Sequence, residues 1–227
     1  SLYVDKAARI IELLVIIALF IVATPALNRI VEWNEAMHLP EALYNIEQWM
    51  RQQENAATKI TEQILQVNSF SHFLAVIFGI GILTGIGEEM IFRGVLQRIV
   101  QDKNHRAHVA VWICAFLFSA IHLQFYGFIP RLLLGAFFGY LLVWSKNLWL
   151  PIFAHLFNNS TVACISYFTN DKSPDNLIET VGTSGSPTSW LAGASLIGTV
   201  ILLYVLYKKV FFSKSKEFFP MEDKITP

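Results

Sequence analysis

The stretch FSHFLAVIFGIGILTGIGEEMIFRGVLQRI, residues 70–99, decides the class of fold. Its first part, residues 70–87, is apolar over a length that crosses a lipid bilayer as a helix. The stretch then runs into Glu88, Glu89 and Arg93, which we expect on the same continuing helix. Charged groups on an apolar span are expensive, so they normally face a protein interior and mark a working site.

The composition of the whole chain supports a membrane protein. Of its 227 residues, 54% are hydrophobic and only 15% are charged, which is too apolar for an ordinary soluble domain. The net charge is zero, so we expect no nucleic acid partner. Cys114 and Cys164 both fall inside apolar runs, which argues against a disulfide framework or a zinc–thiolate site.

The other apolar runs predict an all-α fold, a polytopic transmembrane bundle in a single domain over residues 1–227. We expect the first run to be a retained helix and not a signal peptide. Residues 40–67 differ, because their apolar side chains recur at helical spacing among charged ones, which predicts an amphipathic helix at the membrane interface. The six predicted spans are residues 10–27, 70–87, 107–123, 128–145, 148–168 and 189–207.

The basic residues predict an orientation for these spans. With a cytoplasmic N-terminus, the positive-inside rule is obeyed, so we expect a multi-pass protein of the bacterial inner membrane with both termini in the cytoplasm. The inside segments then hold Lys6, Arg9, Arg93, Arg98, Lys103, Arg106, Lys146, Lys208, Lys209, Lys214, Lys216 and Lys224. The outside segments hold Arg29, Arg51, Lys59, Arg131 and Lys172.

Spacing along the helices indicates which polar residues cooperate. Glu89 and Arg93 are four residues apart with the acid first, the favourable order for an ion pair on a helix. Glu88 is rotated by about 100° from Glu89, which leaves it free for another partner. His155 and Asn159 in the fifth span are also four apart and share one helical face.

Three helices bring such residues to a similar depth. A rise of about 1.5 Å per residue places Glu88, His122 and His155 roughly 15, 21 and 12 Å from the predicted cytoplasmic ends of their helices. A carboxylate and an imidazole can deprotonate a water molecule, while an imidazole and a carboxamide can donate hydrogen bonds to an oxyanion. The set therefore predicts peptide hydrolysis by an activated water without a covalent intermediate.

These residues form three motifs in order, EExxxR, FxxxH and HxxxN, within a motif core of residues 88–159. The set resembles the CPBP family of CAAX proteases and bacteriocin-processing enzymes, also called Abi proteins, which includes the Ras-converting prenyl endopeptidase. The resemblance implies an intramembrane endopeptidase whose active site opens towards the cytoplasm. The motif residues are Glu88, Glu89 and Arg93, then Phe118 and His122, then His155 and Asn159.

The resemblance also implies a role for each motif residue. Glu88 and His122 activate the water, and His155 and Asn159 form the oxyanion site. Glu89 and Arg93 support these groups structurally.

Cofactor, partners and rival functions follow from the same residues. We expect no cofactor; the alternative is a zinc ion on Glu88, His122 and His155, which would make the protein metalloprotease-like. The expected partners are membrane lipid and a peptide or lipidated protein, and prenylated C-terminal peptides, bacteriocin leaders and signalling precursors all stay open. The rival functions are a non-catalytic scaffold or immunity protein and an ion- or proton-coupled transporter.

Overall fold

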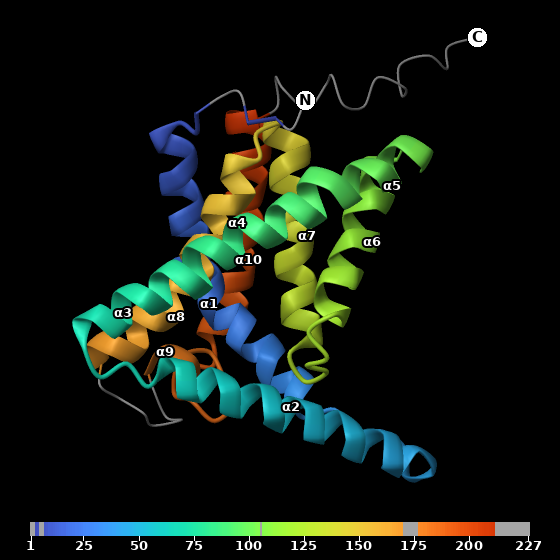
Figure 1. Cartoon of the computed structure of the whole chain (residues 1–227), viewed down its shortest axis with the longest axis vertical. Coiled ribbons are helices and arrows are strands. Elements are labelled where there is room, and N and C mark those ends of the chain that lie inside the picture. Colours follow the sequence, from blue (N-terminus) through green and yellow to red (C-terminus); the bar gives the residue numbers. More distant parts are fainter. Residues whose placement is uncertain (1–2, 5–6, 105, 170–176, 212–227) are drawn as a thin grey trace.

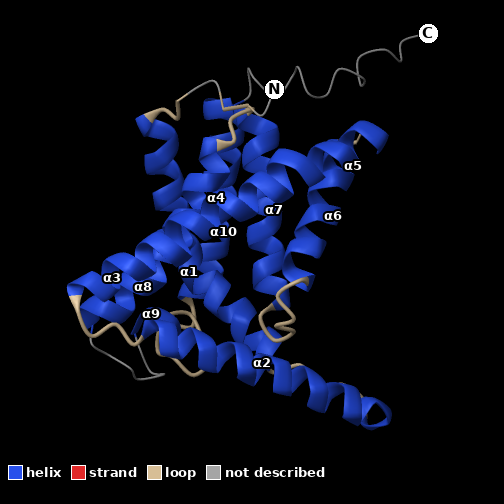
Figure 2. Ribbon diagram, in the orientation of Figure 1, coloured by secondary structure: helices blue, strands red, loops and turns tan. Residues whose placement is uncertain are grey.

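A computed structural model describes residues 3–4, 7–104, 106–169 and 177–211 of the chain (Figure 1). Every regular element within these ranges is helical (Figure 2), so the predicted all-α fold is confirmed. Five basic residues used to predict the orientation lie outside the described residues, namely Lys6, Lys172, Lys214, Lys216 and Lys224.

The helices follow the predicted segments closely. In chain order they are α1 (Ile10–Glu35), the short 3₁₀ helix η1 (Glu41–Leu43), α2 (Tyr44–Leu65), α3 (Phe70–Val76), η2 (Ile77–Leu83), α4 (Thr84–Glu89), η3 (Met90–Leu96), α5 (Gln97–Asn104), α6 (Ala107–Ala120), α7 (Phe128–Ser145), α8 (Trp149–Thr169), α9 (Leu177–Thr180), α10 (Leu191–Val205) and η4 (Leu206–Phe211). The start of α1 and the red η4 lie at the same end of the bundle (Figure 1).

Four helices in the described part of the chain are long and apolar enough to cross a membrane, which supports an integral membrane protein. They are Ile10–Glu35, Phe70–Gln101, Phe128–Ser145 and Leu191–Lys208. The other two predicted spans also form helices, the shorter apolar α6 and the 21-residue α8. Polar residues between His155 and Ser160 lower the mean hydropathy of α8. By length and composition, the structure therefore supports four of the six predicted spans in its described part.

Residues 70–104 form one continuous helical rod, built from α3, η2, α4, η3 and α5. Its apolar part, Phe70–Gln101, has 32 residues, more than a perpendicular crossing needs, and the rod runs obliquely across the bundle (Figure 1). The segments η2 and η3 are π-helical, a geometry that often accompanies functional sites. The short α4, which carries both glutamates, lies between them.

Small residues allow the helices that carry the motif residues to approach one another closely. A Cβ atom on Gly85 would lie 3.2 Å from the backbone nitrogen of Leu156 in α8, and one on Gly135 would lie 3.2 Å from Cα of Ala115 in α6. These glycines belong to small-xxx-small pairs, which permit such contacts in lipid. A larger side chain at either position would push apart two helices that carry site residues.

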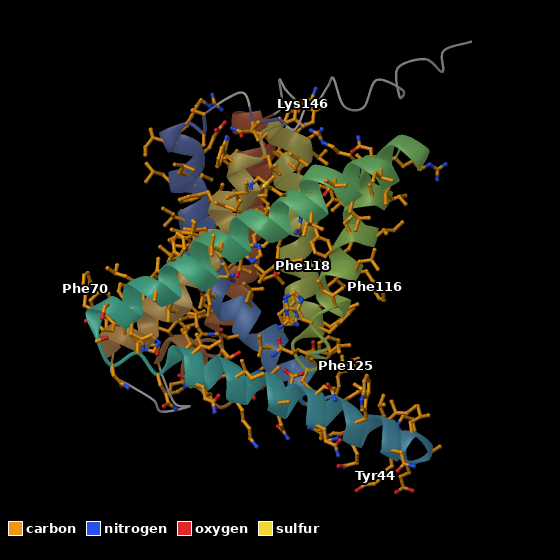
Figure 3. The ribbon with its side chains drawn as sticks, viewed as in Figure 1. Tyr44, Phe70, Phe116, Phe118, Phe125 and Lys146 are labelled. Carbon is orange, nitrogen blue, oxygen red and sulfur yellow. The ribbon has the colours of Figure 1, made fainter. Side chains whose placement is uncertain are left out.

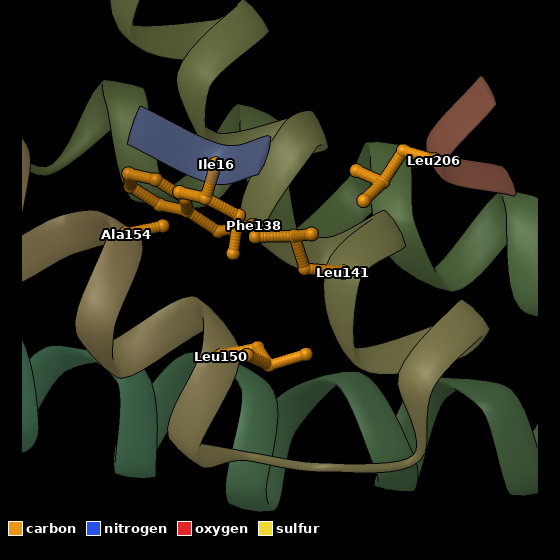
Figure 4. Close-up of a cluster of buried hydrophobic side chains, with 6 residues drawn as sticks. All are labelled: Ile16, Phe138, Leu141, Leu150, Ala154 and Leu206. Carbon is orange, nitrogen blue, oxygen red and sulfur yellow. The ribbon is translucent and has the colours of Figure 1, made fainter. Parts of the chain in front are cut away.

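One buried apolar cluster joins α1, α7, α8 and η4 (Figure 4). Its members are Ile16, Phe138, Leu141, Leu150, Ala154 and Leu206, each at most 1% exposed. Because α8 carries His155 and Asn159, and α7 supplies the Gly135 carbonyl that accepts from Arg93, this cluster fixes the helices that hold these groups.

The predicted amphipathic helix is α2. It lies crosswise at the end of the bundle opposite to η4 (Figure 1), and its apolar side chains include the exposed Ile46 and Ile60. The Trp49 ring lies 5.3 Å from the ring of Phe125, and the backbone N–H of Tyr126 donates to Glu54 at 3.1 Å. The helix therefore holds the connection between α6 and α7.

A carboxylate near the start of α2 should make this helix sensitive to acid. Hydrogen bonds from Arg51, His38 and the backbone N–H of Leu39 lower the pKa of Glu47 from 4.5 to about 2. A lowered pKa contributes stability above pH 4.5 that is lost as the pH falls towards 2. We expect amide protection in α2 to exceed that of a Glu47→Gln variant near pH 6 and to converge with it near pH 2, measured by hydrogen exchange. An equal difference at both pH values would contradict this contribution.

Candidate active site

The most deeply buried polar contact is the predicted ion pair on the rod. Arg93 Nη1 lies 2.8 Å from Glu89 Oε1, and both side chains are 0% exposed. Arg93 Nη2 also donates to the carbonyl oxygen of Gly135 in α7 at 2.8 Å, and its guanidinium lies 4.8 Å from the Phe118 ring centre. Each buried charge therefore has a partner of opposite charge, and the cation also has a carbonyl and an aromatic face.

His155 connects α8 to both glutamates of α4. Its Nδ1 lies 2.9 Å from Glu89 Oε1, and its Nε2 lies 3.9 Å from Glu88 Oε2. An ionised carboxylate can only accept a hydrogen bond, so Nδ1 carries a proton and Nε2 is directed at Glu88. The ring stacks on Phe138 at 5.1 Å, which ties its orientation to the buried apolar cluster.

The two glutamates differ in their surroundings although they are neighbours in sequence. The side chain of Glu88 is 26% exposed, whereas that of Glu89 is fully buried. Within the described residues, Glu88 Oε2 has no hydrogen-bond partner. A buried carboxylate oxygen needs such a partner, and a water molecule or a substrate group can supply it.

His122 follows α6 and faces the same region. Its Nδ1 lies 2.7 Å from the carbonyl oxygen of Phe118, which can only accept, so Nδ1 is the donor and the neutral ring presents a lone pair on Nε2. The Phe118 ring packs edge-on against both histidines, 5.2 Å from His122 and 5.7 Å from His155. Figure 3 shows Phe118 towards the middle of the molecule and Phe116 at its outer edge.

Asn159 joins α8 to the rod one turn beyond His155. Its Nδ2 donates to the carbonyl oxygen of Ile80 in η2 at 3.1 Å, and its Oδ1 accepts from Asn158 Nδ2 at 3.2 Å. These two bonds orient the carboxamide and leave its second N–H for another acceptor.

Comparison with known proteins agrees with the motif core. Residues 70–161 match the family model described as type II CAAX prenyl endopeptidase Rce1-like. The motif core is thus similar to the Rce1-like family. This match supports the resemblance inferred from the three motifs. The matched segment contains all six polar residues of the site.

A curated relative is also similar to part of the chain. Uncharacterized protein YpbD of Bacillus subtilis (strain 168) is 29% identical over 109 residues, which cover 46% of this chain. The match spans about half of that relative, 51% of its length. No solved structure matches the chain.

The Rce1-like segment does not gather a metal site in this structure. Among the residues that the structure describes, no group of three His, Cys, Asp or Glu side chains is arranged to hold a metal ion. Whether Glu88, His122 and His155 bind zinc stays a hypothesis. The Nδ1 atoms of both histidines are bonded, one to Glu89 and one to the carbonyl of Phe118, which leaves the Nε2 atoms for a water molecule or another ligand.

Three contributors to the Rce1-like site were not assigned a role from the sequence. Phe118 supplies a carbonyl to His122 and a ring to both histidines, Gly135 supplies a carbonyl to Arg93, and Phe138 stacks on His155. A backbone carbonyl leaves no mark in a sequence. Two features of the sequence could have pointed to these contributors: Phe118 as the first residue of the FxxxH motif, and the small-xxx-small pair formed by Gly135 and Gly139.

The buried pair makes a prediction about stability. Replacing Arg93 by Met or Glu89 by Gln leaves the other charge buried without its partner, so we expect a loss of about 3–5 kcal/mol of unfolding free energy. Denaturation of the purified protein in detergent measures this loss. Arg29→Gln is the matched control, because Arg29 forms a partly exposed ion pair with Glu32 and should change stability by less than about 1 kcal/mol. An Arg93→Met protein as stable as the control would contradict the role of the pair.

Proposed function

We propose that the protein is an intramembrane endopeptidase that cleaves a membrane-associated or lipidated peptide with an activated water. The observation that carries this proposal is the position of His155 between two adjacent carboxylates, the fully buried Glu89, which is paired with Arg93, and the partly exposed Glu88, whose Oε2 has no hydrogen-bond partner among the described residues. The Rce1-like match supports the same class of reaction.

In this proposal, Glu88 and His122 activate the water molecule. A water molecule that donates to Glu88 and to the Nε2 lone pair of His122 would be held on two sides, and Glu88 is near enough to His122 to act on it electrostatically. As the water oxygen bonds to the carbonyl carbon of the peptide, its proton passes to Glu88. That proton then moves to the amide nitrogen as the C–N bond breaks.

His155 and Asn159 stabilise the oxyanion that forms on the substrate carbonyl. The carbonyl oxygen that gains negative charge accepts from the free N–H of Asn159 and from Nε2–H of His155. The second donor requires a doubly protonated imidazole, whose positive charge is stabilised by Glu89 at 2.9 Å from Nδ1. Glu89 and Arg93 thus act through His155 and do not touch the substrate.

The location and the substrates belong to the same proposal. We infer a multi-pass protein of a bacterial inner membrane with both termini in the cytoplasm, since α1 begins and η4 ends at one end of the bundle (Figure 1). Prenylated C-terminal peptides, bacteriocin leaders and signalling peptide precursors are candidate substrates for a site at membrane depth. No metal cofactor is required by the steps above.

The decisive test removes the two groups that activate water. We expect Glu88→Ala and His122→Ala to abolish cleavage at unchanged protein level, measured by mass spectrometry of peptides from membranes that contain each variant. Glu62→Ala, an exposed carboxylate on α2, is the control and should leave the peptide profile unchanged. Full activity in either site variant would refute the assignment, and a scaffold would lose nothing in any of them. Adding a chelator separates the metal alternative, because loss of cleavage in the wild type would favour bound zinc.

A second test concerns the oxyanion site. Asn159→Ala should cost about 2–4 kcal/mol of transition-state stabilisation, roughly 30- to 10³-fold in kcat, with little change in KM. Asn158→Ala is the matched control, since this neighbour donates to the Oδ1 atom of Asn159, on the side away from the proposed donor N–H, and should reduce kcat by less than about tenfold. Equal losses in the two variants would argue that Asn159 only maintains the packing of α8 on the rod.

A further inference from the structure

Arg131 is the only charged residue of α7, and it lies in the first turn of an 18-residue helix that is long and apolar enough to cross a membrane. A charged side chain in such a helix is costly unless it is paired or faces a functional region. The proposed reaction does not use this residue.

The contacts of Arg131 compensate its charge only in part. Its Nη2 donates to Gln124 Oε1 at 2.7 Å and its Nη1 to the carbonyl oxygen of Gln124 at 3.4 Å, and both acceptors are neutral. In the described part of the chain, no carboxylate forms an ion pair with Arg131. Arg93 differs, because it pairs directly with Glu89 at 2.8 Å.

The guanidinium of Arg131 is nevertheless held at the candidate site, because its partner Gln124 follows His122 by only two residues. Its positive charge also acts electrostatically on Glu88, on the ring of His122 and on Glu54 of α2. A Cβ atom on Gly127 would lie 3.4 Å from Nη2, so the turn between α6 and α7 packs directly against the guanidinium. The carboxylate of Glu54 already accepts from the backbone of Tyr126, and that of Glu88 is the proposed base.

We propose that Arg131 binds a carboxylate of the peptide substrate beside the scissile bond. A guanidinium presents a planar fork of donors that matches a carboxylate, and the pair is strengthened where water is scarce. The carboxylate is either the free C-terminus of the peptide or the side chain of an acidic residue. The first source would put the cleaved bond within a few residues of the C-terminus. This inference rests on the proposed endopeptidase function.

Binding can be measured without cleavage in a Glu88→Gln protein. The probes are three fluorescent forms of one prenylated peptide: the free C-terminal carboxylate, the C-terminal amide, and the amide with glutamate as its last residue. We expect the free carboxylate to bind about 10- to 100-fold more tightly than the plain amide, as for one charge-assisted contact. Adding Arg131→Gln should remove that preference, and Arg131→Lys should keep part of it. Arg29→Gln should leave it unchanged.

The outcomes separate the possible sources and roles. Tight binding of the glutamate form would identify a side-chain carboxylate as the ligand, and weak binding would identify the C-terminus. Equal binding of the carboxylate and the plain amide, or no binding of any probe, would overturn the proposal. An Arg131→Gln variant that weakens all three probes equally would show a purely structural role through Gln124, and would overturn it too. A carboxylate preference in a wild-type protein that cleaves none of the probes would leave the inference standing and count against the proposed protease function.

Discussion

The buried ion pair between Glu89 and Arg93 is the interaction on which the rest of the site depends. Two charges with no solvent exposure are tolerated only if each is compensated, because desolvation of an isolated charge costs several kcal/mol. Arg93 therefore reaches across to the carbonyl of Gly135 on α7, and Glu89 reaches to His155 on α8. The need to compensate one buried pair thus ties three separate helices together at a single depth.

That pair also explains how two adjacent glutamates can serve different purposes. Glu89 Oε1 accepts from both Arg93 and His155, so its charge is committed to the scaffold. Glu88 points in another direction, because successive helical residues are rotated by about 100°, and it keeps 26% of its side chain exposed. Its unpartnered oxygen faces the histidine that Glu89 has oriented. Two identical side chains are thus placed in distinct environments, which is the condition for distinct roles.

Contacts within one helix could be predicted from the sequence, whereas contacts between helices could not. The Glu89–Arg93 pair follows from helical periodicity, and so does the placement of His155 and Asn159 on one face. The bond from Asn159 to the carbonyl of Ile80 depends on how α8 packs against the rod, which no local pattern encodes. Residues 148–168 were predicted as a span and form α8, although the polar residues of the candidate site lower its mean hydropathy and leave it outside the four helices that are long and apolar enough to cross a membrane.

Arg93 and Arg131 both lie in apolar helices, but only the charge of Arg93 is balanced by a carboxylate in the described structure. The first has a carboxylate, a carbonyl and an aromatic ring as partners, which is what a structural cation requires. The second is bonded only to the neutral groups of Gln124, so part of the desolvation cost of its charge is not offset within the described protein. A charge left in this state gains most from an anion that arrives from outside, since the interaction is then absent before binding and present after it. Placing that charge beside Glu88 and His122 links recognition of the anion to the position where hydrolysis would occur.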